Sequence, residues 1–334
     1  MTTIRDVADA AGVSIATVSR ALHGLPRVSE ATRQRVLAVA ADLRYVASPS
    51  AASLASGQTM AIGVVAPFVN RWFFAAVVHS AEERLRPAGY DLLLYSLGTN
   101  AVERQRAFSG TLLHKRVDAV LVLGLQPTAE EVATLSAAGG PVGVVGFAVP
   151  GWCSVRIDEE GAARCAVRHL IDLGHRRIAF IGGEPEDPLL SALPADRLVG
   201  YRGELAAAGI PADRALETVG GFTVPGAMAA MERLLRLPDP PTAVFAASDE
   251  MAMGAIHVAR HAGLRVPGDL SVVGIDDHEM SEMFDLTTVA QPVEAQGVLA
   301  AEMLLAALAE PDRPRPSVTV PTRLVVRGTT GRAG

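Results

Sequence analysis

The sequence predicts an α/β protein, with a small all-α N-terminal head followed by two α/β lobes built on parallel sheets. Three short helical patterns separated by turn residues fill the first 45 residues. After residue 60, apolar runs of strand length alternate with helical stretches, which is typical of a parallel sheet covered on both faces. The alternation restarts once, and 334 residues exceed the roughly 250 to 300 that one hydrophobic core holds. Two lobes therefore fit better than one large sheet.

The head contains three predicted helices, over residues 5–11, 15–22 and 30 to about 44. Each has a hydroxyl side chain in position to cap its N-terminus: Thr3, Ser14 and Ser29. Asp6 stands three residues after Thr3, as in a capping box, and Gly12 ends the first helix. Three short helices with a glycine turn between the first two predict a compact helix-turn-helix bundle.

A linker follows the head. Residues 46–59 read VASPSAASLASGQT, a composition rich in Ser, Ala, Pro and Gly. Leu54 is a lone bulky side chain among small ones. The segment around it can form one or two helical turns, but these would be marginal alone, because isolated helices shorter than about 12 residues rarely persist in water. We therefore expect a head at 1–45, a hinge at 46–59 and the two-lobed part at 60–334.

Apolar runs in the two-lobed part are the predicted strands. In the first series they read AIGVVA, DLLLY, AVLVL and VGVVG, with a helix expected over residues 73–86. In the second series they read RRIAFIGG, TAVFAAS and LSVVGIDD, with helices near 196–208 and over 249–262, and TRLVV is the expected last strand. Clefts between two such lobes bind ligands at the carboxyl ends of the strands.

Charge is distributed unevenly along the chain. The whole chain has a net charge of −6, but residues 1–59 hold six arginines against four acidic residues, a net +2, which leaves −8 for the remainder. A mildly basic head on an acidic body is expected when only the head touches phosphates.

Several classes of function find no support in the sequence. The first residues carry charged side chains in place of a signal peptide's apolar core, and no apolar run approaches the ~18 residues of a membrane span, so we expect a cytoplasmic protein without membrane contact. Cys153 and Cys165 form no CxxC pair, and His169 with His175 faces no third metal ligand. We expect no metal, no cofactor and no catalytic residues.

A family resemblance covers nearly the whole chain. The run TIRDVADAAGVSIATVSRALHG, followed by PRVSEATRQRV and the hinge, closely resembles the lac-repressor (LacI/GalR) family of bacterial regulators. SVRIDEEGAARCAVRHLIDLGHRRIAFIGG, DRLVGYRGEL, ASDEMAMGAI and GLRVPGDLSVVGIDDHEM look like that family's effector domain. The resemblance implies a fold similar to periplasmic sugar-binding proteins, a homodimer, and binding to operator DNA that a small effector controls, here expected to be a carbohydrate. We expect one lobe at roughly 60–158 with 290–320, and the other at 159–289 with 321–330.

The second helix of the head is the expected reader of DNA. In a helix-turn-helix its N-terminal side chains meet base edges in the major groove, here Ile15, Ala16 and Arg20. Arg20 can contact guanine with two hydrogen bonds, whereas Ile15 and Ala16 offer only apolar contact to thymine methyl groups. The resemblance adds phosphate and neighbouring-base contacts from Ser14, Thr17, Ser19 and His23, and backbone contacts from Thr3, Ser29, Thr32 and Tyr45.

The hinge and the head each leave a second interpretation open. By the resemblance, Leu54 wedges between base pairs from the minor groove. It can also be an exposed linker residue, and the bundle can be an ordinary helical hairpin in which Ser14 only caps and Arg20 pairs with a carboxylate. Ala52 and Ala55 stand where the family commonly has basic residues, which puts minor-groove charge contacts in doubt.

The resemblance also implies effector contacts. Arg197 in DRLVGYRG and Asp276 at the end of SVVGID match the family's polar cleft residues, and we expect them on opposite walls of the cleft between the lobes. Phe222 matches an aromatic wall, and Phe73 and Phe74 stand where first-lobe residues line the pocket. Ser248 and Asp249 are expected to cap the next helix first and to touch ligand second.

Other roles stay open for the effector contacts. Phe73 and Phe74 can be core residues, Asp276 can cap a strand end, and Arg197 can form a surface ion pair. Arg71 and Trp72 replace an Asn-Pro pair common in the family, which makes the effector's identity hard to transfer.

Two further interpretations of the protein's function remain open. The lobes can belong to a sugar-metabolising or sugar-transport protein with the head as an accessory, although the reader helix and the missing secretion signal argue against this. The regulator can also be an activator or a constitutive repressor, and nothing in the sequence separates these.

Overall fold

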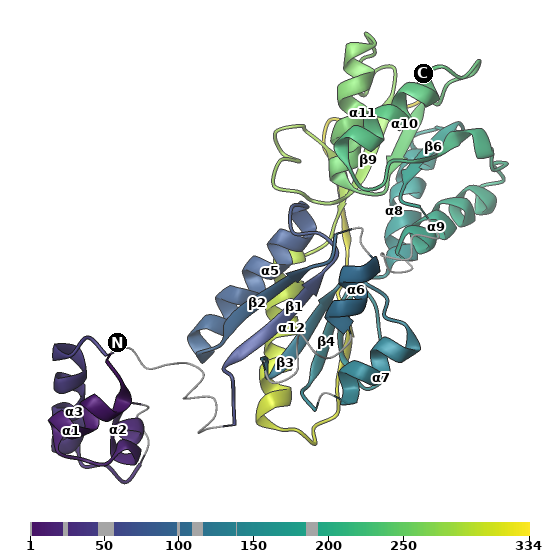
Figure 1. The fold of residues 1–334 in the computed structure, drawn as a ribbon. Coiled ribbons are helices and arrows are strands. Elements are labelled where there is room, and N and C mark those ends of the chain that lie inside the picture. The colour runs from purple at the N-terminus through teal and green to yellow at the C-terminus, as the bar shows by residue number, and fades with distance from the viewer. Residues whose placement is uncertain are drawn as a thin grey trace. The chain divides into compact units, whose positions relative to one another are not determined.

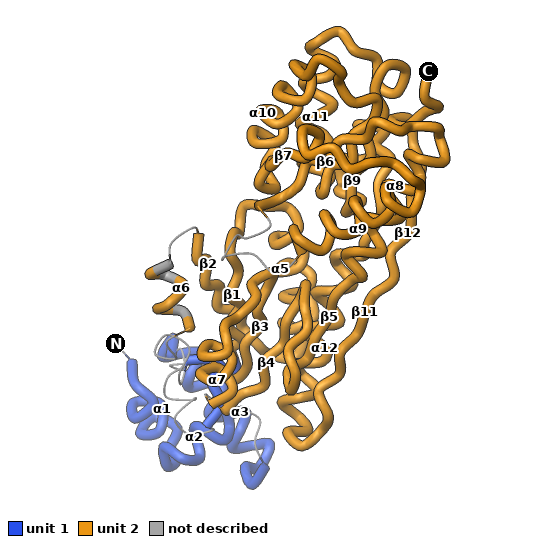
Figure 2. Tube along the Cα trace, turned by 90° about the vertical axis from the view of Figure 1, so that its right-hand side faces the viewer, with its two compact units in different colours: residues 1–60, 115–117 blue, residues 61–114, 118–334 orange. Residues whose placement is uncertain are grey.

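The computed structural model describes residues 2–22, 26–45, 57–98, 101–108, 116–137, 139–184 and 193–334. His23 and Leu54, two of the predicted DNA contacts, lie outside the described residues. The chain divides into two compact units (Figure 2). Unit 1 contains residues 1–60 with 115–117, and unit 2 contains residues 61–114 and 118–334.

Unit 1 is a bundle of the helices α1 (Ile4–Ala11), α2 (Ile15–Leu22) and α3 (Glu30–Asp42). Their apolar faces share one small core, formed by Val7, Ala8, Ala11, Val18, Ala21, Val36 and Ala40. Helices of this length are marginal in isolation. The packing of these small side chains therefore stabilises the bundle.

Local signals fix the ends of these helices. Thr3 and Asp6 form the expected capping box, in which the Asp6 carboxylate accepts from the Thr3 N–H at 2.7 Å. Gly12 ends α1 at φ 67°, a backbone conformation that glycine adopts without strain. The third helix ends at Asp42, two residues before the predicted end, because Arg44 takes a left-handed φ of 49°.

Unit 2 contains two six-stranded sheets (Figure 1). The first has the order β11-β5-β4-β3-β1-β2, with β1 (Ala61–Ala66), β2 (Asp91–Ser96), β3 (Ala119–Leu123), β4 (Val142–Val145), β5 (Cys153–Arg156) and β11 (Ser317–Thr319). The second has the order β12-β10-β9-β8-β6-β7, with β6 (Ile178–Gly182), β7 (Glu217–Val219), β8 (Ala243–Ala246), β9 (Ser271–Asp276), β10 (Thr287–Ala290) and β12 (Arg323–Val325). We call the parts built on them the first and the second lobe.

Helices flank both sheets (Figure 1). Those of the first lobe are α5 (Trp72–Leu85), α6 (Ala101–Phe108), α7 (Ala129–Ala137) and α12 (Val293–Ala309), with the 3₁₀ turn η1 (Arg86–Ala88). Those of the second are α8 (Glu159–Asp172), α9 (Leu193–Ala207), α10 (Val224–Leu235) and α11 (Asp249–His261), with the 3₁₀ turn η2 (Arg214–Leu216). Each lobe has its own buried apolar cluster, and α5 and α12 share the cluster of the first lobe with β1.

Two strands depart from the predicted pattern of parallel strands covered on both faces. β2 is the edge strand of the first sheet, and Leu93 and Leu94 are 36% and 43% exposed there. Its apolar run therefore does not mark a covered strand, because β2 has a strand partner on one side alone among the residues that the structure describes. β12 pairs with β10 in the antiparallel direction, whereas the pairs among the other strands are parallel.

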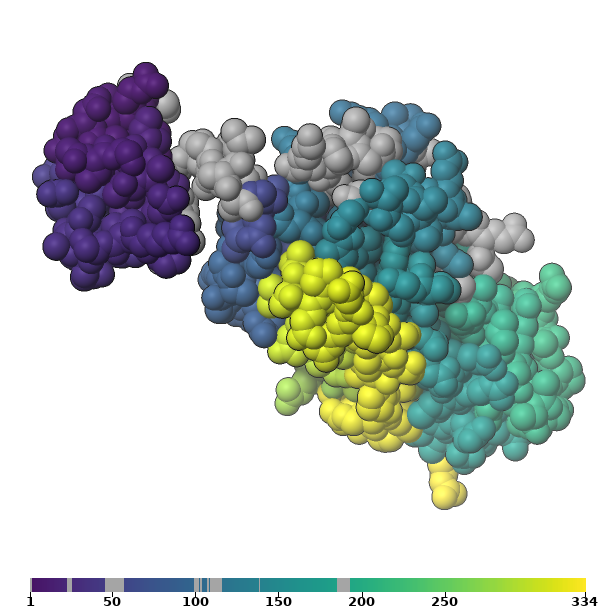
Figure 3. Space-filling view, turned by 90° about the horizontal axis from the view of Figure 1, so that it is seen from below, coloured from purple at the N-terminus to yellow at the C-terminus, as the bar shows by residue number. Residues whose placement is uncertain are grey.

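The described chain passes between the lobes at three places, from β5 to α8, from β10 to α12 and from β11 to β12. Residues 310–316, between α12 and β11, are largely exposed and form part of the yellow-green surface in Figure 3. Of the helices in the described ranges, none combines the length and the apolar character that crossing a membrane requires.

Candidate functional site

The predicted reading face of unit 1 lies on α2. Ser14, Ile15, Ala16 and Arg20 are exposed, whereas Thr17 and Ser19 are half-buried. The Ser14 hydroxyl accepts from the Thr17 N–H at 3.2 Å and lies 2.9 Å from the Thr17 hydroxyl, so it caps α2. Within the described residues, the Arg20 guanidinium forms no ion pair. This face can therefore meet a DNA groove without first breaking an internal salt bridge.

The predicted backbone contacts of unit 1 also have local partners. The Ser29 hydroxyl caps α3 by accepting from the Thr32 N–H at 3.3 Å, and it lies 2.8 Å from the Thr32 hydroxyl. Thr3 and Ser29 are exposed at helix N-termini, where backbone N–H groups favour phosphate. Tyr45 is half-buried and packs against the core of unit 1.

One pocket of unit 2 brings the six predicted effector contacts together. It has a volume of about 80 Å³ and is lined by Phe73, Phe74, Arg197, Phe222, Ser248 and Asp276, among others. Gly124 and Gly146, directly after β3 and β4, also line it, so it lies at the carboxyl ends of strands from both lobes. That is where ligands bind in open parallel sheets.

Arg197 lies in a buried ion pair. Its side chain is 2% exposed, its Nε donates to Glu159 Oε2 at 2.7 Å, and its Nη1 donates to the carbonyl of Ala247. Burial raises the pKa of the Glu159 carboxyl, and Arg197 beside it opposes that shift. The alternative of a surface ion pair is therefore wrong for Arg197. The pair fixes a planar donor group at the pocket wall.

Asp276 closes the pocket from the end of β9. It accepts from Gln291 Nε2 at 2.6 Å, and its φ of 137° is unusual for a residue with a side chain. Burial raises the pKa of Asp276; Arg197 opposes this shift and Asp249 adds to it. Arg197 and Asp276 both belong to the second lobe, so the expectation that they lie on opposite walls of the cleft is wrong. The reason is that α9 packs on α8 and on β6, in the same lobe as β9.

Aromatic rings form the apolar walls. Phe73 and Phe74 come from the first turn of α5, and their rings meet edge to face at 5.4 Å. A Cβ at Gly124 would lie 2.7 Å from the Phe74 ring. Phe222 has a φ of 53° and comes from the second lobe. The phenyl groups thus lie against the pocket from both lobes, so the core-only interpretation of Phe73 and Phe74 is incomplete.

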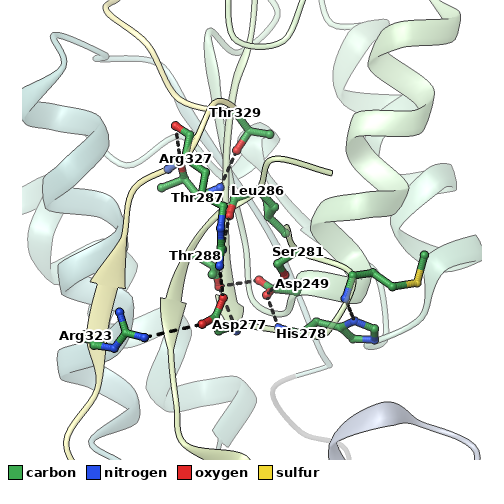
Figure 4. Close-up of polar contacts among 11 residues, drawn as sticks. Asp249, Asp277, His278, Ser281, Leu286, Thr287, Thr288, Arg323, Arg327 and Thr329 are labelled. Carbon is green, nitrogen blue, oxygen red and sulfur yellow. Dashed lines mark hydrogen bonds and ion pairs between the residues drawn. The ribbon is translucent and has the colours of Figure 1, made fainter. Parts of the chain in front are cut away.

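Ser248 and Asp249 begin α11 as expected. The Ser248 hydroxyl accepts from the Met251 N–H at 3.4 Å. The Asp249 carboxylate does not line the pocket, and it accepts from the hydroxyls of Thr288 and Ser281 at 2.7 Å and from the His278 N–H at 2.9 Å (Figure 4). The expectation that Asp249 touches a ligand is wrong, because these three donors already satisfy it inside the second lobe.

Some pocket residues escaped the sequence reasoning: Arg71, Glu159, Glu250, Gln291 and Gln296. They sit at helix starts, or between β10 and α12, where charged and amide side chains are common and carry no motif. The Trp72 ring also lies 4.6 Å from the ring of His278, which joins α5 to the loop after β9. Only the fold brings these groups together.

Two histidines of the second lobe, His169 and His175, contact residues near the C-terminus. Among the described residues, no group of three or more His, Cys, Asp or Glu side chains can hold a metal ion. The Nδ1 atom of His175 lies 3.0 Å from the Thr242 hydroxyl, and its Nε2 atom lies 3.1 Å from the carbonyl oxygen of Gly331. The Nε2 atom of His169 lies 2.9 Å from the Thr330 hydroxyl. Both therefore anchor the C-terminal segment.

Comparison with known proteins agrees with both units. Residues 3–48 match the model of bacterial regulatory proteins of the lacI family, and residues 167–330 match a periplasmic binding protein-like domain. Catabolite control protein A of Priestia megaterium is 34% identical over 335 residues, covering 98% of this chain and 99% of that protein.

Two solved structures extend the comparison. The lac repressor dimer bound to operator and the anti-inducer ONPF is similar with a TM-score of 0.88 and 29% identity, covering 99% of both chains. A complex of the transcriptional regulator CelR with cellobiose has a TM-score of 0.72 and 35% identity, covering 98% of this chain and 100% of that one. The chain is a DNA-binding transcriptional regulator, and it belongs to the lacI family of bacterial regulatory proteins.

Proposed function

We propose that this regulator is a homodimeric repressor whose affinity for a pseudo-palindromic operator is set by a small carbohydrate in the pocket between the lobes. The observation that carries the proposal is the pocket itself. It combines a buried arginine and a buried carboxylate with phenyl rings from both lobes. Such a site can bind vicinal hydroxyls at its polar end and the apolar face of a sugar ring against phenylalanine. The CelR structure holds cellobiose and the lac repressor structure holds operator, which supports the same two ligand classes here.

The proposed DNA contacts are the reading face of α2 with the capping residues of α1 and α3. Arg20 supplies the bidentate contact, and His23 and Leu54 complete the set from outside the described residues. The head at 1–45, the hinge at 46–59 and the lobes at 60–334 are the division that we propose on this basis. Because the operator partner is chromosomal, we place the protein in the cytoplasm. We assign it no enzymatic activity.

Exposed apolar side chains support a second copy of the chain as partner. Leu93 and Leu94 lie on the open edge of the first sheet, and Met280 and Met283 are 39% and 71% exposed in the second lobe. An apolar edge strand invites pairing unless another surface covers it. A dimer that covers both patches also gives the two reader helices that symmetric half-sites require.

The test is a thermal-shift screen of sugars that includes cellobiose, followed by operator titrations with the best compound. Asp276→Ala should abolish the response to that compound while effector-free operator affinity stays within about threefold, or ~0.7 kcal/mol. Glu282→Ala is the control, because Glu282 is an exposed carboxylate on the turn after β9 and does not line the pocket. A normal response in Asp276→Ala would remove Asp276 from the site. A wild type that no sugar shifts would remove the carbohydrate.

A further inference from the structure

A second cavity lies in the first lobe, apart from the effector pocket. It has a volume of about 210 Å³ and is bounded by β5, by the C-terminal half of α12 and by the exposed segment that joins α12 to β11. Among the described residues, the two sites share no lining side chain. An apolar protein cavity of about 150 Å³ holds a benzene molecule. This cavity therefore has room for a six-membered ring with a small substituent.

Most of the cavity wall is apolar. Met303, Ala306 and Ala307 contribute to it from α12, and Pro314 and Pro316 contribute from the connecting segment. Such walls hold a ligand by removing its apolar surface from water, while a few polar groups fix its orientation. A wholly polar solute such as inorganic phosphate gains little from them. The walls therefore favour a ligand with a compact apolar part.

One buried hydrogen-bond donor of Arg315, which lines this cavity, has no acceptor. Arg315 Nη2 donates to the carbonyl of Pro311 at 2.9 Å, which holds the side chain against the connecting segment. The Nη1 atom is buried and has no hydrogen-bond partner among the described residues. A buried donor without an acceptor destabilises the protein, so an acceptor supplied from the cavity recovers this loss. A carboxylate suits the position, because a guanidinium group holds it with two parallel hydrogen bonds.

The charges around the cavity favour an anion. Glu302 lines it, but its carboxylate already pairs with Arg84 of α5 at 3.0 Å. Arg313 lines it too, and its ion pair with Glu310 is long, at 3.9 Å, and exposed to solvent. Arg315 pairs with no carboxylate in the described part of the chain. The two arginines therefore give the cavity an excess of positive charge.

Arg315 also borders a neighbouring cavity of about 370 Å³. Asp118 lines that cavity and would repel a carboxylate. The Trp152 indole N–H there already donates to the Ser136 hydroxyl at 3.1 Å. The smaller cavity is therefore the better match for an anion.

We propose that the cavity between β5, α12 and residues 310–316 is a second ligand site, which takes a small aromatic or branched aliphatic carboxylate. The carboxylate binds Arg315, whose flexible side chain rotates to bring Nη1 to one of the ligand's oxygens, and Arg313 adds a second positive charge. The apolar part of the ligand lies against Met303 and the two prolines. This site is independent of the pocket between the lobes, so the inference goes beyond the proposed function.

Benzoate is the probe, and calorimetry together with NMR of isotope-labelled methionine methyl groups tests the site in the full-length protein. Benzoate should bind saturably with a Kd of about 1 mM or tighter, and its ring should shift the methyl signal of Met303. The signals of Met251 and Met253, on α11 of the second lobe, should stay in place. Benzyl alcohol lacks the charge and acetate lacks the ring, so each should bind at least about 10-fold more weakly.

Two variants test the parts of the site separately. Arg315→Met should weaken benzoate binding by roughly 10- to 150-fold, the effect of a hydrogen bond to a charged group. Arg236→Met is the matched control, because Arg236 pairs with Glu232 at the end of α10 in the second lobe, and it should bind benzoate like the wild type. Ala306→Leu fills the cavity with a residue that suits a helix, and it should abolish the shift at Met303.

Several results would overturn the proposal. Benzoate that leaves the Met303 signal unchanged, or that shifts only signals of the second lobe, binds elsewhere or not at all. Acetate or inorganic phosphate binding as tightly as benzoate would remove the role of the apolar walls. Normal benzoate binding by Arg315→Met or by Ala306→Leu would show that the cavity is not the site.

Discussion

Two adjacent glutamates on α8 allow a sharp test of the buried ion pair. Glu159 is 8% exposed and holds the guanidinium of Arg197, which is 2% exposed. Glu160 pairs with Arg164 one turn away, and these side chains are 44% and 41% exposed. Both glutamates lie in the first turn of the same helix, so substitution by alanine removes the same favourable interaction with the helix dipole. They differ in burial and in the partner that each would leave behind.

Glu159→Ala leaves an arginine buried without its carboxylate, and breaking a buried pair in this way costs about 3 to 5 kcal/mol. A domain of this size loses roughly 2 to 4 °C in Tm per kcal/mol, so Tm should fall by about 6 to 20 °C. Glu160→Ala removes an exposed pair of about 0.3 to 0.5 kcal/mol and should lower Tm by no more than about 2 °C. Calorimetry and urea unfolding of both variants measure the difference. Equal Tm values for the two variants would refute the structural role of the pair.

Three further outcomes are expected. Arg20→Ala should cost about 1 to 3 kcal/mol of operator binding and relax preference at one base pair per half-site, whereas an equal loss on every sequence would make Arg20 a phosphate contact. Leu54→Ala should reduce specific binding and DNA bending in gel-shift assays without changing the Tm of the lobes, and unaltered bending would return Leu54 to the linker. Burial lowers the pKa of His175, so the unfolded chain takes up the proton first and the free energy of unfolding should fall as pH drops below about 6.5. Urea unfolding at pH 7.5 and 5.5 checks this, and a flat profile would contradict it.

Local signals in the sequence predicted much of the fold. The caps at Thr3 and Ser29, the glycine turn at Gly12 and the apolar runs of the strands depend on neighbouring residues, so they can be read without the structure. The exposed edge strand β2 could not be predicted this way. Its run DLLLYS looks like a covered strand, and only the strand order of the sheet places it at an edge.

The same distinction applies to the candidate site, where some residues could be predicted and others are identified only by the fold. The family resemblance supplied Arg197 and Asp276, but not the partners that orient them. Glu159 follows a strand, and in the sequence it looks like any acidic residue at the start of a helix. Gln291 and Gln296 look like two ordinary amide side chains at the start of another helix. Their roles arise from contacts that span 38, 15 and 5 residues of sequence, which periodicity and capping rules do not address.

The central claim is that the chain is a dimeric, sequence-specific reader of DNA, and selection from a random duplex library with the purified full-length protein tests it most directly. Bound duplexes should converge on a pseudo-palindrome of about 14 to 20 base pairs, because two reader helices related by a two-fold axis require symmetric half-sites. The mass of the complex, measured by light scattering, should correspond to two chains per duplex. A monomer at micromolar concentration together with a library that shows no enriched motif would contradict the account.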